Sequence, residues 1–297
     1  MERPFRFRDG QPIVWFHRKL ERSNQCCLYC FRFLGDGAVP SNREHLIGRA
    51  FVPPGTFDKG QEFNFIFRAC EECNGAKAEC ERHVSTITLF RSPARSSDKV
   101  DAVATRKASS DFHPVLKGKR VDEAGSEMSV ELRNSMFDAK VGFVGPPQLA
   151  HDYVRQLALW HTQGLFSLIA SPAPLQVDGL RVLPPERHWL GRYYFHADWG
   201  NALLLELARR VRTWTTYVNV VSAGGFFKAV LKRDESGTGQ GFWALEWNKS
   251  LRVVGGIAES EPEVFDELPD PGWHRISDDT RVRQERSLAP GEDTLFE

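Results

Sequence analysis

Two pairs of cysteines with the same internal spacing constrain this chain more than any other feature. Cys27 and Cys30 form one CxxC pair, and Cys70 and Cys73 form a second pair further along the chain. Each pair can present two thiolates from one tight turn, and four thiolates complete a tetrahedron around Zn2+. The sequence therefore predicts a structural zinc site that joins two segments distant in sequence.

The remaining cysteines leave some alternatives open. All six cysteines lie between residues 26 and 80, so Cys26 and Cys80 are left over. Cys26 could replace Cys27 as a ligand, although the two-residue spacing of Cys27 and Cys30 matches that of the second pair. The cysteines could also be buried small hydrophobes or form a disulfide. Zinc is favoured because the first twenty residues contain no apolar signal core, which predicts a cytoplasmic protein with reduced thiols.

The residues around the two pairs resemble the zinc-knuckle branch of the HNH nucleases. The run Ser41-Asn42-Arg43-Glu44-His45-Leu46-Ile47 stands between the pairs, and Cys70-Glu71-Glu72-Cys73-Asn74-Gly75-Ala76-Lys77 and His83 follow it in that order. The resemblance covers roughly residues 20 to 92. It implies a ββα-metal fold, in which one strand presents Glu44 and His45, a second strand follows a loop, and a helix carries His83.

The resemblance also assigns roles to four side chains. His45 would be the general base, since a neutral imidazole can take a proton from water near neutral pH. Glu44 and His83 would hold one divalent cation against the scissile phosphate. Asn74 would orient His45 by bonding its backbone. In the alternative interpretation, Glu44, His45 and His83 are surface polar residues of a catalytically silent zinc module, and Asn74 is a helix N-cap.

Two positions depart from the pattern of the family. Gly48 stands where many relatives have proline, and Ile87 stands one turn after His83, where the secreted nuclease toxins place another metal-binding histidine. The catalytic site would therefore have few protein ligands. Such a site suits a mostly hydrated Mg2+ or Mn2+ better than a tightly held transition metal.

Local patterns agree with the implied layout. Phe63–Phe67 is aromatic and β-branched and predicts a strand, while Pro53-Pro54-Gly55 before it predicts a loop. From Glu71 to about Phe90 there is no proline, and Gly75 near the start is the one glycine, which predicts a helix.

Charge is distributed unevenly along the chain. The formal net charge is zero, but residues 1–120 carry 21 Lys and Arg against 14 Asp and Glu, a surplus of seven positive charges. The positive part is the part with the nuclease-like motif, as expected of a domain that meets a phosphate backbone, although the surplus could also be a solvated face. We expect DNA as the partner, with RNA left open, and no membrane association, since no segment has the apolar length of a span.

The second half predicts helices followed by strands. One helix is expected from Pro147, with His161 on its apolar face as a core residue, and another from about Asp198 to Arg212. Four short runs rich in β-branched and aromatic residues follow, and they predict an antiparallel meander packed on the two helices. These runs are Thr213–Val221, Phe226–Lys232, Phe242–Trp247 and Leu251–Ile257.

The predicted fold class is α+β, with four regions along the chain. Residues 1–92 would form the HNH domain with its zinc knuckle, and residues 93–145 a connection with some β structure, including a strand-like run at Lys140–Val144. Residues 146–258 would form an α+β domain that recognises a partner or a DNA feature. Residues 259–297 hold 12 acids against four arginines, and we expect an acidic tail with little fixed structure.

These observations favour a metal-dependent HNH endonuclease that cleaves phosphodiester bonds of DNA. The acidic second half argues against an autonomous reader of a long DNA site. An effector of bacterial antiviral defence or of a mobile element, acting beside a second protein that senses the target, fits better. One such site cuts one strand, so a double-strand break would need a homodimer or two visits. The alternative is the silent zinc module that binds nucleic acid or a protein partner.

Overall fold

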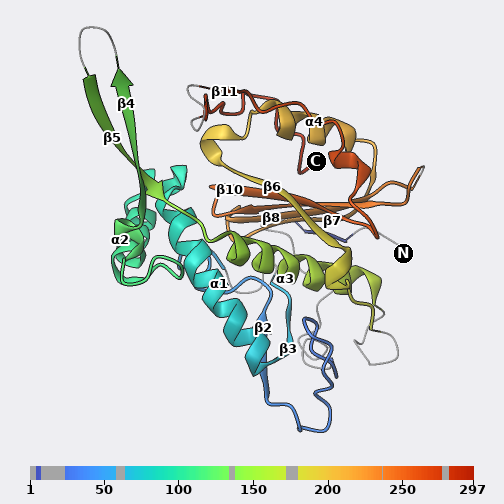
Figure 1. Ribbon diagram of the computed structural model, residues 1–297. Coiled ribbons are helices and arrows are strands. Elements are labelled where there is room, and N and C mark those ends of the chain that lie inside the picture. The colour runs from blue at the N-terminus through green and yellow to red at the C-terminus, as the bar shows by residue number, and fades with distance from the viewer. Residues whose placement is uncertain are drawn as a thin grey trace.

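The structure, a computed structural model, describes residues 5–7, 24–57, 64–133, 138–171, 180–235, 237–275 and 281–297. It confirms the α+β class: a small hairpin is followed by a helix, and a larger antiparallel sheet lies between helices (Figure 1). None of the helices in these ranges has the length and apolar character needed to cross a bilayer.

The predicted hairpin and helix are present in the N-terminal part. Strand β2 (Ser41–His45) pairs antiparallel with β3 (Ile66–Cys70), and α1 (Glu71–Phe90) begins at the next residue. The bounds of α1 agree with the prediction. Of the strand expected at Phe63–Phe67, Phe63 lies outside the described residues, and β3 begins at Ile66. The acidic side chains in the first turn of α1 interact favourably with the positive end of the helix dipole.

The region after α1 contains more regular structure than the expected connection. Helix α2 (Asp98–Ser110) packs on α1 through small buried residues at four-residue spacing, Val100, Ala104 and Ala108. Strands β4 (Gly125–Arg133) and β5 (Asp138–Pro147) then form a two-stranded arm that projects from the body (Figure 1). The expected strand at Lys140–Val144 lies inside β5.

The larger sheet contains the predicted meander and two strands that were not predicted. Its strand order is β1-β7-β8-β9-β10-β6, antiparallel throughout except for the parallel pair β1 and β7. The edge strands β1 and β6 are the unpredicted ones. The bounds are β1 Phe5–Phe7, β6 His188–Phe195, β7 Thr215–Ser222, β8 Phe227–Arg233, β9 Gly241–Trp247 and β10 Leu251–Ile257.

Helices cover both faces of this sheet. Helix α3 (His151–Ala170), close to the predicted position, packs against α1 and contacts the sheet at β6 and β7, while α4 (Ala202–Arg210) lies on the opposite face (Figure 1). His161 of α3 is fully buried, as predicted. The long α3 helix therefore stands between the hairpin unit and the sheet.

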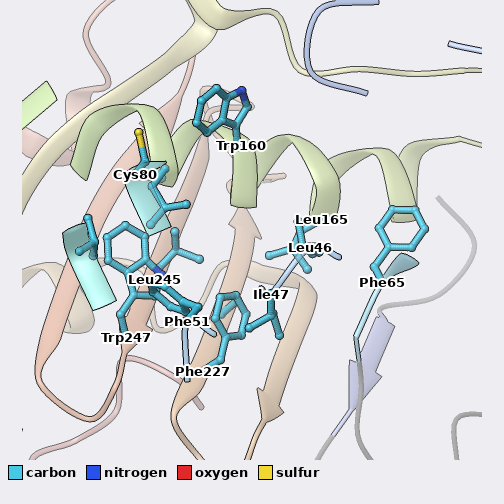
Figure 2. Close-up of a cluster of buried hydrophobic side chains, with 14 of the residues drawn as sticks. Leu46, Ile47, Phe51, Phe65, Cys80, Trp160, Leu165, Phe227, Leu245 and Trp247 are labelled. Atoms are coloured by element: carbon cyan, nitrogen blue, oxygen red, sulfur yellow. The ribbon is translucent and has the colours of Figure 1, made fainter. Parts of the chain in front are cut away.

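One buried cluster runs from the hairpin unit into the sheet. Leu46 and Phe51, from the segment after β2, belong to the same core as Phe227 and Trp247 of the sheet (Figure 2). The Phe51 ring lies edge-on to Trp247, with ring centroids 5.9 Å apart. Gly164 of α3 allows the close approach, because a Cβ there would lie 2.4 Å from a methyl carbon of Leu46.

The described parts of the last segment, residues 259–275 and 281–297, pack on the body of the protein, in contrast to the expected acidic tail. Strands β11 (Trp273–Arg275) and β12 (Arg281–Arg283) pair with each other, and Leu295 and Phe296 are buried under the sheet face that carries α4. Asp293 binds the buried guanidinium of Arg252 at 2.5 Å. The high content of acidic residues predicted a tail without fixed structure, but these few apolar residues are enough to pack the segment against the sheet.

Candidate functional site

The four CxxC cysteines lie together, as the spacing predicts. Their Sγ atoms all lie within 4.8 Å of one another, and Cys30 Sγ is 3.6 Å from Cys70 Sγ. A zinc–sulfur distance of about 2.3 Å requires tetrahedral edges of about 3.8 Å, so the group fits Zn2+. Within the described ranges, this is the one group of three or more Cys, His, Asp or Glu side chains that converges in this way.

Hydrogen bonds favour the thiolate form of one cysteine of the group, Cys27, whereas burial raises the pKa of Cys70 and the hydrogen bond with Cys27 raises that of Cys73. A hydrogen bond with the Cys73 thiol lowers the pKa of Cys27 to about 5. Burial opposes this shift, and hydrogen bonds with the backbone of Cys70, Cys30 and Tyr29 add to it. Thiolate is the form that binds metal.

An arginine reaches the same sulfur atoms from outside the group. The Arg32 guanidinium donates to Cys30 Sγ at 3.3 Å and to Cys70 Sγ at 3.2 Å. Its positive charge offsets part of the negative charge that four thiolates carry around one Zn2+. Cys26 and Cys80 stay outside the group, which agrees with the choice of Cys27 over Cys26.

Glu44 is buried in an ion pair with a lysine. Its Oε1 lies 2.8 Å from Lys77 Nζ, and the Tyr29 hydroxyl donates to the same oxygen at 3.1 Å. Burial raises the pKa of Glu44, and the attraction of Lys77 opposes that shift. The carboxylate that was expected to bind a catalytic cation therefore already has a cationic partner from the chain.

His83 is packed on the other side of α1. Its Nε2 accepts the backbone N–H of Ala150 at 2.9 Å, and its ring lies edge-on to the rings of His113 and Tyr153. Burial lowers the pKa of His83 to about 3. The imidazole is therefore a neutral core side chain at the start of α3.

The resemblance implied that Glu44 and His83 hold one ion together. The structure places these two side chains apart. Lys77, which binds Glu44, precedes His83 by six residues on α1. Six residues advance a helix by about 9 Å and turn it to a different face. The fold instead satisfies the two groups separately, Glu44 through Lys77 and His83 through Ala150.

His45 lies half-buried at the end of β2. Its Nε2 is shielded from solvent and has no hydrogen-bond partner among the described residues. Burial, with smaller contributions from the charges of Arg43 and Arg49, lowers the pKa of His45 to about 4. The imidazole is therefore neutral at pH 7 and keeps a nitrogen that can accept a proton.

Asn74 does not bond the backbone of His45. Its amide donates to the side chain of Asn42 and, at 3.4 Å, to the carbonyl of Arg43, which shifts the expected contact two residues back along β2. It is not the helix N-cap either, because that position belongs to Cys70. Asn74 therefore ties the first turn of α1 to the start of the hairpin at an exposed position.

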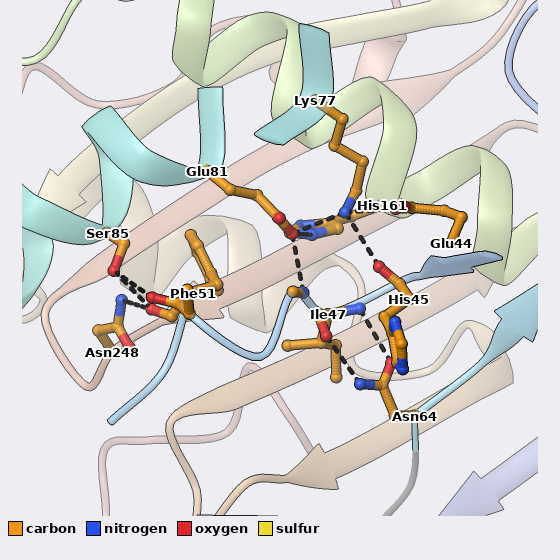
Figure 3. A network of polar contacts seen from close by, with 12 residues as sticks. Glu44, His45, Ile47, Phe51, Asn64, Lys77, Glu81, Ser85, His161 and Asn248 are labelled. Atoms are coloured by element: carbon orange, nitrogen blue, oxygen red, sulfur yellow. Dashed lines mark hydrogen bonds and ion pairs between the residues drawn. The ribbon is translucent and has the colours of Figure 1, made fainter. Parts of the chain in front are cut away.

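Residues to which the resemblance assigned no role hold the backbone at His45 and just after it (Figure 3). Lys77 Nζ donates to the His45 carbonyl at 3.1 Å. Asn64 accepts the N–H of Ile47 at 3.0 Å and donates to its carbonyl at 2.7 Å. The available signals were an asparagine just before the second strand and the four-residue spacing of Lys77 and Glu81 on one helix.

Glycine at position 48 has a structural reason here. Its N–H donates to Glu81 Oε1 at 2.9 Å, and a Cβ at this residue would lie 2.1 Å from a Glu81 oxygen. Proline would remove the donor and clash with the carboxylate. The departure from the family pattern is thus matched to the Glu81 side chain.

Comparison with known proteins adds no relative: no family model, no curated protein and no solved structure matches this chain. The geometry itself establishes a four-cysteine group able to hold zinc, built on a two-stranded sheet followed by a helix.

Proposed function

We propose that the chain is a zinc-closed endonuclease of the HNH type that cleaves phosphodiester bonds of DNA, with His45 as the general base. The observation that carries the proposal is the neutral, half-buried His45 imidazole at the end of a strand in a hairpin-helix unit that carries the four-cysteine group. In such a site, the neutral His45 imidazole takes a proton from water as the water attacks phosphorus.

Charge near His45 supports a phosphate-bearing substrate. Arg43 and Arg49 are exposed within two and four residues of the base, and both act on its pKa. The first 120 residues carry the positive surplus of the chain. Guanidinium groups bind phosphate oxygens with two parallel hydrogen bonds, so these two arginines are suited to hold the backbone beside His45.

The proposed reaction uses a divalent cation that Glu44 and His83 do not hold between them. The Glu44 carboxylate is neutralised by Lys77, and His83 is bonded to Ala150, so these two side chains do not fit a shared ion. Mg2+ or Mn2+ would then be held mostly by water and by the substrate phosphate, as hard, well-hydrated cations often are. We also propose a second protein that senses the target, because the acidic second half of the chain argues against reading a long DNA site alone.

The second candidate is the catalytically silent zinc module that binds nucleic acid or protein. The placement of Glu44 and His83 favours it, because both expected metal ligands already have protein partners. The two candidates agree on zinc at Cys27, Cys30, Cys70 and Cys73 and differ on what His45 does.

A plasmid assay separates the two candidates. The full chain would be incubated with supercoiled plasmid and millimolar Mg2+ or Mn2+, beside His45→Ala and the matched control His274→Ala, an exposed histidine of β11. We expect nicking by the parent and the control, and a loss of roughly 10²–10⁴-fold in His45→Ala, since base catalysis contributes that much. EDTA should stop cleavage while zinc analysis still finds one zinc per chain. A parent protein that binds DNA without ever cutting it would favour the silent module.

A further inference from the structure

Two charged side chains of α1 hold the backbone that carries His45. We propose that Lys77 and Glu81 are positioning residues for His45, an inference that rests on the proposed nuclease function. Lys77 Nζ donates to the His45 carbonyl at 3.1 Å, and Glu81 accepts the N–H of Gly48 at 2.9 Å. The two contacts bracket the turn that follows the base, one at each end (Figure 3).

The two side chains also hold each other. Lys77 Nζ lies 2.6 Å from Glu81 Oε1, and the residues stand one helical turn apart on α1. Lys77 is 0% exposed, so its ammonium cannot exchange these partners for water. Buried charges keep a fixed geometry when partners satisfy their hydrogen-bonding groups, and here Lys77 has three oxygen partners, from His45, Glu44 and Glu81.

This arrangement gives Glu44 a different role from metal binding. The Lys77 ammonium lies between two carboxylates, and Glu44 is its second carboxylate partner beside Glu81. The charge beside the base thus serves to fix Lys77, which in turn fixes the His45 backbone. Because α1 also carries Cys73, the zinc group and the base are attached to one rigid helix.

The far end of the same segment is anchored to the sheet. The Phe51 carbonyl accepts hydrogen bonds from Ser85 of α1 at 2.7 Å and from the side chain of Asn248, in the turn between β9 and β10, at 3.0 Å. Between these anchors, Lys107 of α2 donates to the Ala50 carbonyl at 2.8 Å. Lys107 is thus a lysine that bonds the same segment without touching the turn next to His45.

The test compares two variants that keep the net charge with a control that removes a different lysine. Lys77→Met combined with Glu44→Gln removes one positive and one negative charge together, Lys77→Arg keeps the cation, and Lys107→Met is the matched control. We expect the double variant to lower kcat for plasmid nicking by roughly 10–100-fold with KM within about twofold, because a base displaced by about 1 Å can lose that much. Lys77→Arg should recover part of the loss, and Lys107→Met should cut almost as the parent does.

Three results would overturn the inference: full kcat in the double variant, a change in KM alone, or an equal loss in Lys107→Met. Should the parent itself not cleave, the nuclease proposal fails while positioning can still be measured. Amide hydrogen exchange of Gly48 should then become at least tenfold faster in Glu81→Met and stay unchanged in Lys107→Met. Unchanged exchange in Glu81→Met would show that Glu81 does not hold this turn.

Discussion

Helix α1 carries two polar clusters that solve the same electrostatic problem in different ways. At its start, four cysteine sulfurs converge with no lysine among them, and Arg32 bonds two of them from outside. Further along, the carboxylates of Glu44 and Glu81 converge on Lys77. The comparison teaches that a cluster of potential ligands needs no metal where a cation of the chain lies between the ligands, as Lys77 does between Glu44 and Glu81, whereas Arg32 bonds the sulfurs only from outside and leaves them suited to a metal. The first cluster therefore calls for zinc, and the second does not.

The largest effect should come from breaking the cysteine cluster. Cys70→Ser should abolish zinc binding and unfold the protein, because structural zinc contributes roughly 10–16 kcal/mol in small zinc domains, as much as or more than a whole domain's stability. Zinc analysis and circular dichroism of the purified variant would measure this. Cys26→Ser, at a cysteine outside the cluster, is the control and should keep both zinc and fold.

A folded Cys70→Ser protein without zinc would contradict the first half of the comparison. It would mean that the shared core around Phe51 and Trp247 holds the hairpin unit without the metal.

Removing the cation of the second cluster should cost less but remain large. Lys77→Met leaves two carboxylates buried without their partner, and breaking a buried pair in this way costs about 3–5 kcal/mol. Urea unfolding would measure the loss. Lys77→Met with Glu44→Gln should be less destabilised than Lys77→Met alone, since it buries one uncompensated charge fewer. If the single and double variants were equally stable, Glu44 would not be the partner of Lys77.

The fully buried His161, beside the second cluster, should make the protein sensitive to acid. Burial lowers the pKa of His161 to about 4, from about 6.5 for an exposed histidine. The unfolded chain therefore takes up the proton first, and stability that is present above pH 6.5 is lost as the pH falls towards 4, by about 3 kcal/mol for this residue. The ring lies among those of Phe51, Phe227 and Trp247.

His161→Phe tests this contribution while keeping an aromatic ring in place. We expect the difference in unfolding free energy between pH 7 and pH 4.5 to shrink in the variant, as measured by urea unfolding at the two pH values. An unchanged difference would assign the acid sensitivity to other buried groups, such as His83.

The smallest effect should come from Asn74. Its contacts with Asn42 and Arg43 lie at an exposed position, where a hydrogen bond contributes about 0.5–1.5 kcal/mol. Asn74→Ala should therefore shift the unfolding midpoint only slightly and leave the zinc content at one per chain. If cleavage disappeared in a stable Asn74→Ala protein, Asn74 would act on the substrate and not on the hairpin.

The sequence predicts local features of this molecule well. Spacing alone brought Cys27, Cys30, Cys70 and Cys73 together, because each pair needs only a turn. The absence of proline predicted α1, apolar residues at helical spacing predicted α3, and runs rich in β-branched and aromatic residues predicted β7 to β10. The nuclease-like motif placed His45 on a strand, as observed.

Features that depend on distant partners could not be predicted in this way. The resemblance assigned a metal to Glu44 because the motif does not show that Lys77 of α1 binds the same carboxylate. The resemblance assigned a metal to His83 because the sequence does not show that the N–H of Ala150, 67 residues away, donates to its ring. Strand β6 and the packed C-terminal segment were missed for the same reason, since their stability comes from neighbours and not from their own pattern.

The contact between Phe51 and Asn248 sets an order of events during synthesis. These residues are 197 positions apart, yet the Asn248 amide bonds the backbone that follows His45. A ribosome that has released only the first half of the chain can offer zinc its four thiolates, but the apolar side of the hairpin unit still lacks Phe227 and Trp247. The N-terminal unit thus completes its packing only after most of the chain has emerged, and truncated products would expose apolar surface to chaperones and proteases.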